Sequence, residues 1–133
     1  MAVAARDVYA QSRFETSSPG RLVVMLYDGA LRDVDRATNA FEQGDAGTAH
    51  ERLLHAQEIV LELLSALDTT SWAGGAGLAN LYVFLVRELM RANVERDVSV
   101  LTTCRTMLEE LRGAWEAALA GQQTRPAVSG SVA

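Results

Sequence analysis

The sequence predicts an all-α protein: an antiparallel up-down four-helix bundle with a short N-terminal helix packed against it. Apolar residues recur with a period of about 3.5 residues, and no stretch alternates between apolar and polar residues as a strand does. Two very short links, at Gly44-Asp45 and at Asp97, and one longer link at 69–77 separate four such stretches. Helices joined by short links pack as antiparallel neighbours, with axes that cross at about 20°.

The first long helix is expected from about Pro19 to Gln43. Ser18 suits the N-cap, and Pro19 suits the first helical position, where its missing N–H costs nothing. Gly44 suits the position just after the helix, and Asp45 suits the N-cap of the next one. The expected core positions of the first helix are Val23, Leu26, Ala30, Val34, Ala37 and Phe41.

The other three helices carry apolar stripes with similar spacing. In the second helix the stripe consists of Ala49, Leu53, Ala56, Val60, Leu63 and Leu67. In the third helix it consists of Leu78, Tyr82, Leu85, Leu89 and Ala92. In the fourth helix, which Asp97 can cap, it consists of Leu101, Cys104, Leu108, Leu111, Trp115 and Ala118.

These stripes predict a single domain over residues 1–121. Residues at about 4–15 are expected to form the short N-terminal helix, which carries Val8, Tyr9 and Phe14 and is too short to be stable alone. Residues 122–133 are polar and small, so we expect a disordered tail there.

The composition argues against several classes of function. The net charge is −5, and an acidic chain gains no affinity from counterion release, so nucleic acid is a poor candidate partner. No apolar run approaches the roughly 20 residues that span a bilayer, and no secretory signal is recognisable at the N-terminus. The single cysteine, Cys104, fits a reducing compartment. We therefore expect a cytoplasmic protein that does not insert into membranes.

One cluster of potential metal ligands lies on the second helix. It consists of His50, Glu51, His55 and Glu58. Glu51 and His55 share a helical face, but a di-metal bundle needs two Glu-x-x-His motifs, and that motif does not occur in the sequence. We interpret the cluster as a solvated charged face and Cys104 as a packed core thiol. No catalytic residue, cofactor or metal site is therefore predicted, and a small metal- or nuclease-type helical enzyme is the less favoured alternative.

The helices carry more apolar residues than their core stripes require. The additional residues are Leu22 and Met25 in the first helix, Leu54, Leu61 and Leu64 in the second, and Val83, Val86 and Met90 in the third. One residue is about 100° of rotation, so these positions lie at the edge of the core or outside it. An exposed apolar stripe commonly receives another chain. Gly29, in mid-helix, costs about 1 kcal/mol relative to alanine, which is consistent with the close approach of another segment.

Residues 16–30 read Thr-Ser-Ser-Pro-Gly-Arg-Leu-Val-Val-Met-Leu-Tyr-Asp-Gly-Ala and resemble the signature of the flagellin-specific export chaperones, the FliS family. The matching residues are Thr16, Ser18, Pro19, Met25, Leu26, Tyr27, Gly29 and Ala30, and Ser17 replaces the usual alanine. Further matches follow in order at Gly44-Asp45, Ala56-Gln57-Glu58-Ile59, Asn80-Leu81-Tyr82, Ala92-Asn93, Asp97 and Trp115. The resemblance covers about residues 9–118 and departs from the family pattern at Val83 and Phe84.

The resemblance implies a four-helix bundle of the bacterial cytosol that uses no nucleotide or metal. It implies that the chain binds the C-terminal segment of flagellin and prevents premature polymerisation before flagellar type III export, whose apparatus is a further candidate partner. It also implies that Tyr9 packs, in the free chaperone, into an apolar site that flagellin later occupies. The candidate partner-binding residues are Tyr9, Leu22, Met25, Leu54, Leu61, Leu64, Tyr82, Val83, Val86, Met90 and Asn93. A helical-bundle adaptor for another amphipathic partner is the alternative function.

Overall fold

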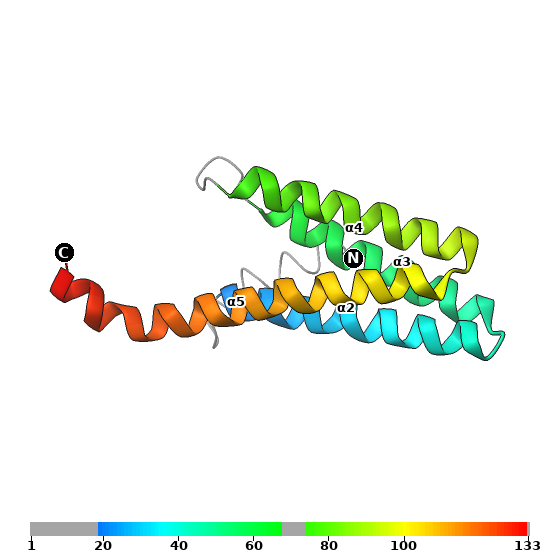
Figure 1. The fold of residues 1–133 in the computed structure, drawn as a ribbon, viewed down its shortest axis with the longest axis horizontal. Helices are drawn as coiled ribbons and strands as arrows, with labels where there is room; N and C mark the ends of the chain where they lie inside the picture. The colour runs from blue at the N-terminus through cyan, green and yellow to red at the C-terminus, as the bar shows by residue number, and fades with distance from the viewer. Residues whose placement is uncertain (1–18, 68–73, 133) are drawn as a thin grey trace.

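The computed structural model describes residues 19–67 and 74–132. These residues form four helices: α2 (Pro19–Glu42), α3 (Ala46–Ala66), α4 (Gly75–Glu95) and α5 (Val98–Val132). The helices pack in a ring in which α2 contacts α3, α3 contacts α4, α4 contacts α5, and α5 returns to α2 (Figure 1). The predicted all-α four-helix bundle is therefore confirmed, whereas the helix predicted at about 4–15 lies outside the described residues. No helix within these ranges is long and apolar enough to cross a membrane.

The ion pairs between α2 and α5 show that these neighbours run antiparallel. The guanidinium of Arg105, in the first half of α5, donates to Asp35 at 2.7 Å. Arg112, later in α5, donates to Asp28, which is earlier in α2. Later residues of one helix thus meet earlier residues of the other, as the short links predicted.

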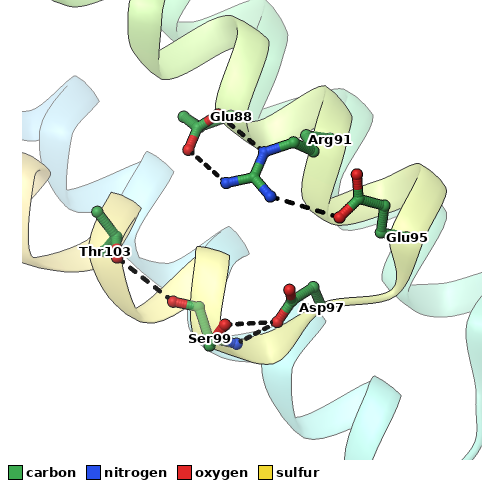
Figure 2. Close-up of polar contacts among 6 residues, drawn as sticks. All are labelled: Glu88, Arg91, Glu95, Asp97, Ser99 and Thr103. Carbon is green, nitrogen blue, oxygen red and sulfur yellow. Dashed lines mark hydrogen bonds and ion pairs between the residues drawn. The ribbon is translucent and has the colours of Figure 1, made fainter.

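Aspartate residues cap α3 and α5, as predicted. The Asp45 carboxylate accepts hydrogen bonds from the Thr48 backbone N–H at 3.1 Å and from the Thr48 hydroxyl at 2.7 Å. The Asp97 carboxylate accepts from the Ser99 backbone N–H at 2.9 Å and from the Ser99 hydroxyl at 2.6 Å (Figure 2). These bonds stabilise the charged form, so the pKa of each aspartate lies below its ordinary value. Between α2 and α3, Gly44 adopts the left-handed conformation with φ of 77°.

Two helix boundaries differ from the prediction. Helix α4 begins at Gly75, inside the loop predicted at 69–77, because the Leu78 N–H donates to the Gly74 carbonyl oxygen at 3.0 Å and starts the helix early. Helix α5 continues to Val132, where the sequence predicted a disordered tail over 122–133, and this part projects beyond the bundle in Figure 1.

The core contains a pair of tyrosines on opposite helices of the ring, Tyr27 on α2 and Tyr82 on α4. Tyr27 is fully buried and Tyr82 is 2% exposed. Their hydroxyl oxygens are 2.5 Å apart and their ring centroids are 6.5 Å apart. Each hydroxyl therefore has a hydrogen-bond partner in the apolar interior. Burial raises the pKa of Tyr82, although hydrogen bonds with Tyr27 and Trp115 oppose this shift, so the phenol stays protonated at neutral pH.

The predicted core stripes are confirmed in α4 and, except for half-buried Leu67, in α3. Of the positions predicted in α2, three are buried, namely Ala30, Val34 and Ala37. The other three, Val23, Leu26 and Phe41, are half-buried. Four further residues of α2 that the prediction did not include are buried: Leu22, Val24, Tyr27 and Ala40. Because α2 packs between α3 and α5, its buried face is wider than one stripe. In α5, Leu101, Cys104 and Leu108 are buried, Leu111 and Trp115 are half-buried, and Ala118 is exposed. Burial raises the pKa of the Cys104 thiol to about 12, as expected of a core thiol.

Candidate functional site

Exposed apolar side chains on two adjacent helices form one candidate surface. This surface, the α3–α4 face, consists of Leu54, Leu61, Val83 and Met90, which are 43, 47, 37 and 50% exposed. The Asn93 side chain of α4 lies 2.8 Å from Nδ1 of His50 on α3. Because α3 and α4 run antiparallel, each step forward along α3 from this contact corresponds to one step backward along α4. By this count Leu54 lies beside Met90 and Leu61 lies beside Val83, to within one residue. The members on each helix are seven residues apart, so two apolar ridges run side by side.

Burial separates several other predicted partner-binding residues from this surface. Leu64 and Val86 are half-buried and pack against the core. Leu22 is 8% exposed and Tyr82 is buried, so the structure places both residues in the core rather than on a free surface. Asn93 is half-buried at the end of the face.

Two predicted residues remain, Met25 and Tyr9. Met25 is 58% exposed on α2, which is a neighbour of α3 and α5 in the ring and reaches α4 only across the core through Tyr27, so Met25 stands apart from the α3–α4 face. Tyr9 lies outside the described residues.

The structure adds a second candidate surface, the α4–α5 hollow. It has a volume of about 280 Å³ and is lined by Leu67, Leu78, Leu111, Ala114, Trp115 and Ala118. All of these side chains are apolar apart from the indole N–H, so the hollow suits an apolar side chain of a partner. The α4–α5 hollow also borders the core, because Leu67, Leu111 and Trp115 of its lining pack against the buried residues.

Two exposed apolar residues lie on the side of α4 that faces α5. Figure 2 shows Glu88 and Arg91 on the side of α4 that faces the start of α5, with an ion pair of 2.8 Å between them. Leu81 and Phe84 precede Glu88 by seven and four residues and therefore lie on the same side of α4. They are 42 and 46% exposed. This side of α4 is thus polar near the link to α5 and apolar near the start of α4.

Sequence reasoning missed the hollow because it assigned Leu78, Leu111 and Trp115 to a closed core. In Figure 1 the ribbons of α4 and α5 diverge away from their short link, and the hollow is lined by residues of both helices far from that link. The one available signal was the apolar character of Leu81 and Phe84, which lie beside the predicted stripe of the third helix.

Charged residues gather at the contact between α2 and α3. Asp33 is 3% exposed and binds both Arg52, at 3.2 Å, and the ring of His55. This corrects the interpretation of His55 as part of a solvated charged face, although Glu51 is exposed as expected. In the part of the chain that the structure describes, no group of three or more His, Cys, Asp or Glu side chains is placed to hold a metal ion.

Replacement of His55 by alanine is expected to lower the free energy of unfolding by about 1 kcal/mol, because the buried Asp33 carboxylate loses one of its hydrogen-bond partners. His50→Ala is the matched control, since the contact of His50 with Asn93 is exposed and contributes less. Thermal unfolding followed by circular dichroism measures both effects. Equal melting temperatures for both variants and the parent would contradict the structural role of His55, and zinc or iron bound at one equivalent would reopen the metal site.

Comparison with known proteins decides the family. The family model described as "Flagellar protein FliS" matches residues 1–122. The chain belongs to the FliS family of flagellar secretion chaperones. The flagellar secretion chaperone FliS of Bacillus subtilis (strain 168) is 30% identical over 125 residues, which cover 94% of this chain and 93% of that protein. FliS of Salmonella typhimurium is 32% identical over 114 residues, which cover 83% of each chain.

Membership in the FliS family confirms the resemblance found in the sequence motifs. The FliS relative from Vibrio cholerae is 30% identical over 112 residues, which cover 84% of this chain and 82% of that protein. These relatives are chaperones and not enzymes, so the alternative of a metal- or nuclease-type helical enzyme is removed.

Proposed function

We propose that this chain binds the C-terminal segment of flagellin in the bacterial cytoplasm and keeps it from polymerising until type III export. Membership in a family of flagellar secretion chaperones supports the proposal. The observation that carries it in the structure is the exposure of apolar residues on both sides of α4, in the α3–α4 face and beside the α4–α5 hollow. A folded single domain exposes such residues in contiguous groups chiefly where another chain docks.

The two surfaces suit different parts of one bound segment. The parallel ridges of the α3–α4 face fit the apolar side of an amphipathic helix, which binds through residues spaced three, four and seven apart. The α4–α5 hollow fits single apolar side chains of a helical or extended stretch. Burial of one leucine- or methionine-sized side chain contributes about 1.5–3 kcal/mol, so a few such contacts supply substantial affinity before the cost of ordering the segment.

The mechanism that we propose is masking. A segment held against the bundle has its apolar side covered, so it is not available to pair with another flagellin molecule. Binding of this kind needs no bond chemistry and no nucleotide. By the family resemblance, we also propose that Tyr9 covers part of this apolar surface until flagellin arrives, and that components of the flagellar export apparatus receive the complex.

Flagellin with and without its C-terminal segment tests the proposed function. The purified chain is expected to capture full-length flagellin as a soluble complex and to lose capture when the C-terminal segment is deleted. Pull-down and size-exclusion chromatography measure both results. Equal capture of the two flagellins would contradict the C-terminal assignment, and equal affinity for an unrelated amphipathic helix would favour the adaptor alternative.

A further inference from the structure

Two glutamates on α3 each have one buried carboxylate oxygen that lacks a hydrogen-bond partner among the described residues. Glu62 is 2% exposed, and its Oε2 atom has no hydrogen-bond partner among the described residues. The Oε2 atom of half-buried Glu58 is likewise buried without a described partner. The two residues are four apart, so their carboxylates lie on one side of the helix, a single turn from each other. Glutamate is almost never fully buried unless it is paired, because an unpaired buried charge is costly.

Glu58 and Glu62 lie along the seam between α2 and α3. A Cβ atom added to Gly29 of α2 would lie 3.3 Å from Cδ1 of Ile59, so the two helices approach closely beside these glutamates. Because α2 and α3 run antiparallel, a step forward along α3 from Ile59 corresponds to a step backward along α2 from Gly29. By this count Met25 lies beside Glu62, to within one residue. Met25 is 58% exposed, and its unbranched side chain can move aside to admit a ligand.

The chemistry of this site suits a guanidinium group. The planar fork of N–H donors in arginine binds carboxylates bidentately, and two carboxylates one turn apart present several acceptor atoms to it. A calcium or magnesium ion takes six or more ligands, and within residues 19–67 and 74–132 no third acidic, His or Cys side chain joins such a group. The guanidinium of Arg32 lies 3.8 Å from the same Gly29 Cβ position, yet it leaves both Oε2 atoms unpaired.

We propose that Glu58 and Glu62 form a subsite for an arginine of the bound flagellin segment, with Met25 covering the aliphatic part of that arginine. This proposal rests on the proposed function, and it specifies that the bound flagellin segment contributes an arginine. The seam and the α3–α4 face lie on opposite flanks of α3, so a segment that crosses the outer side of α3 reaches both. Apolar ridges provide affinity but little orientation. A charge pair at one end of the path fixes the direction in which the segment runs.

Isosteric substitutions test this subsite. Glu62→Gln and Glu58→Gln remove the charge and keep the shape. Glu51→Gln is the matched control because it is an exposed glutamate on the same helix, about two turns from Glu58 and three turns from Glu62. Full-length flagellin is the probe, and its affinity is measured by titration for each variant. A second series replaces each arginine of the flagellin C-terminal segment with glutamine, one at a time, and the two series are combined in double-mutant cycles.

Glu62→Gln is expected to weaken flagellin binding about tenfold or more, as for a lost hydrogen bond to a charged group, while Glu51→Gln leaves the affinity unchanged. One of the flagellin arginine variants should bind the parent chain with the same loss of affinity. Combining that flagellin variant with Glu62→Gln should lower the affinity no further. The melting temperature of free Glu62→Gln should equal or exceed that of the parent, since the buried Oε2 atom makes no hydrogen bond that the substitution would remove.

Three results would count against the proposal, and they are distinguishable. Parent-like flagellin binding by the folded Glu62→Gln and Glu58→Gln variants would overturn the subsite and leave the proposed function intact. A failure of the parent protein to bind flagellin would overturn both. A lower melting temperature of Glu62→Gln, with no further lowering when Arg32→Gln is added, would assign the site to an arginine of this chain and overturn the proposal.

Discussion

A variant that carries Leu61→Asp together with Met90→Asp is expected to lose flagellin capture while it remains a folded bundle. Both side chains are about half exposed, so the new carboxylates stay solvated in the free protein. A docked segment would have to bury both charges without partners, which costs several kcal/mol and reduces affinity at least about a hundredfold. Titration with flagellin measures the affinity, and circular dichroism measures the retained helix.

The control for this variant adds the same charge elsewhere on the bundle. Thr102→Asp with Thr106→Asp introduces two carboxylates at exposed positions one turn apart on α5, and it is expected to bind flagellin like the parent. A folded Leu61→Asp, Met90→Asp protein that binds with parent-like affinity would remove the α3–α4 face from the proposed function. The α4–α5 hollow would then be the surface that carries binding.

Replacement of Tyr82 by alanine is expected to lower the free energy of unfolding by about 3–5 kcal/mol, the range for loss of a large aromatic side chain from a core. This is a large fraction of the about 5–15 kcal/mol that stabilises a typical domain. The variant should therefore lose flagellin binding through unfolding, although Tyr82 was a predicted partner-binding residue. Urea denaturation followed by circular dichroism measures the stability.

Tyr82→Phe separates a core role from a contact with flagellin. It keeps the ring and removes the hydroxyl, which leaves the buried Tyr27 hydroxyl without that partner and costs about 1–3 kcal/mol. The folded fraction of this variant should bind flagellin with unchanged affinity. An alanine variant with parent-like stability and no binding would instead place Tyr82 in the interface.

The helices and most of the core were predictable because that information is local. Each helix carries an apolar stripe and is bounded by a turn or cap residue such as Gly44, Asp45 or Asp97, and those signals need no knowledge of neighbours. The flanks of the helices were less predictable. Leu22 and Met25 both flank the core stripe of α2 in the sequence, yet Leu22 is buried and Met25 is exposed.

Two features of the candidate site depend on tertiary structure alone. The α4–α5 hollow is lined by residues of separate helices, whose sequences show only that each helix is amphipathic. The role of His55 depends on Asp33, which lies 22 residues earlier on a neighbouring helix. No periodicity within α3 distinguishes a histidine held in this way from one that is fully solvated.

The hydroxyl pair of Tyr27 and Tyr82 has a consequence for the alignment of the helices. A bundle core of leucine and alanine tolerates shifted packing, because one apolar contact can replace another. A slip of α2 by one turn, about 5 Å, would break this hydroxyl–hydroxyl bond inside an apolar interior. The pair therefore penalises misaligned bundles, in a protein whose exposed leucines and methionines could otherwise exchange places with core residues. A chaperone that must present an apolar surface thus carries, at its centre, a polar contact that specifies which apolar residues stay inside.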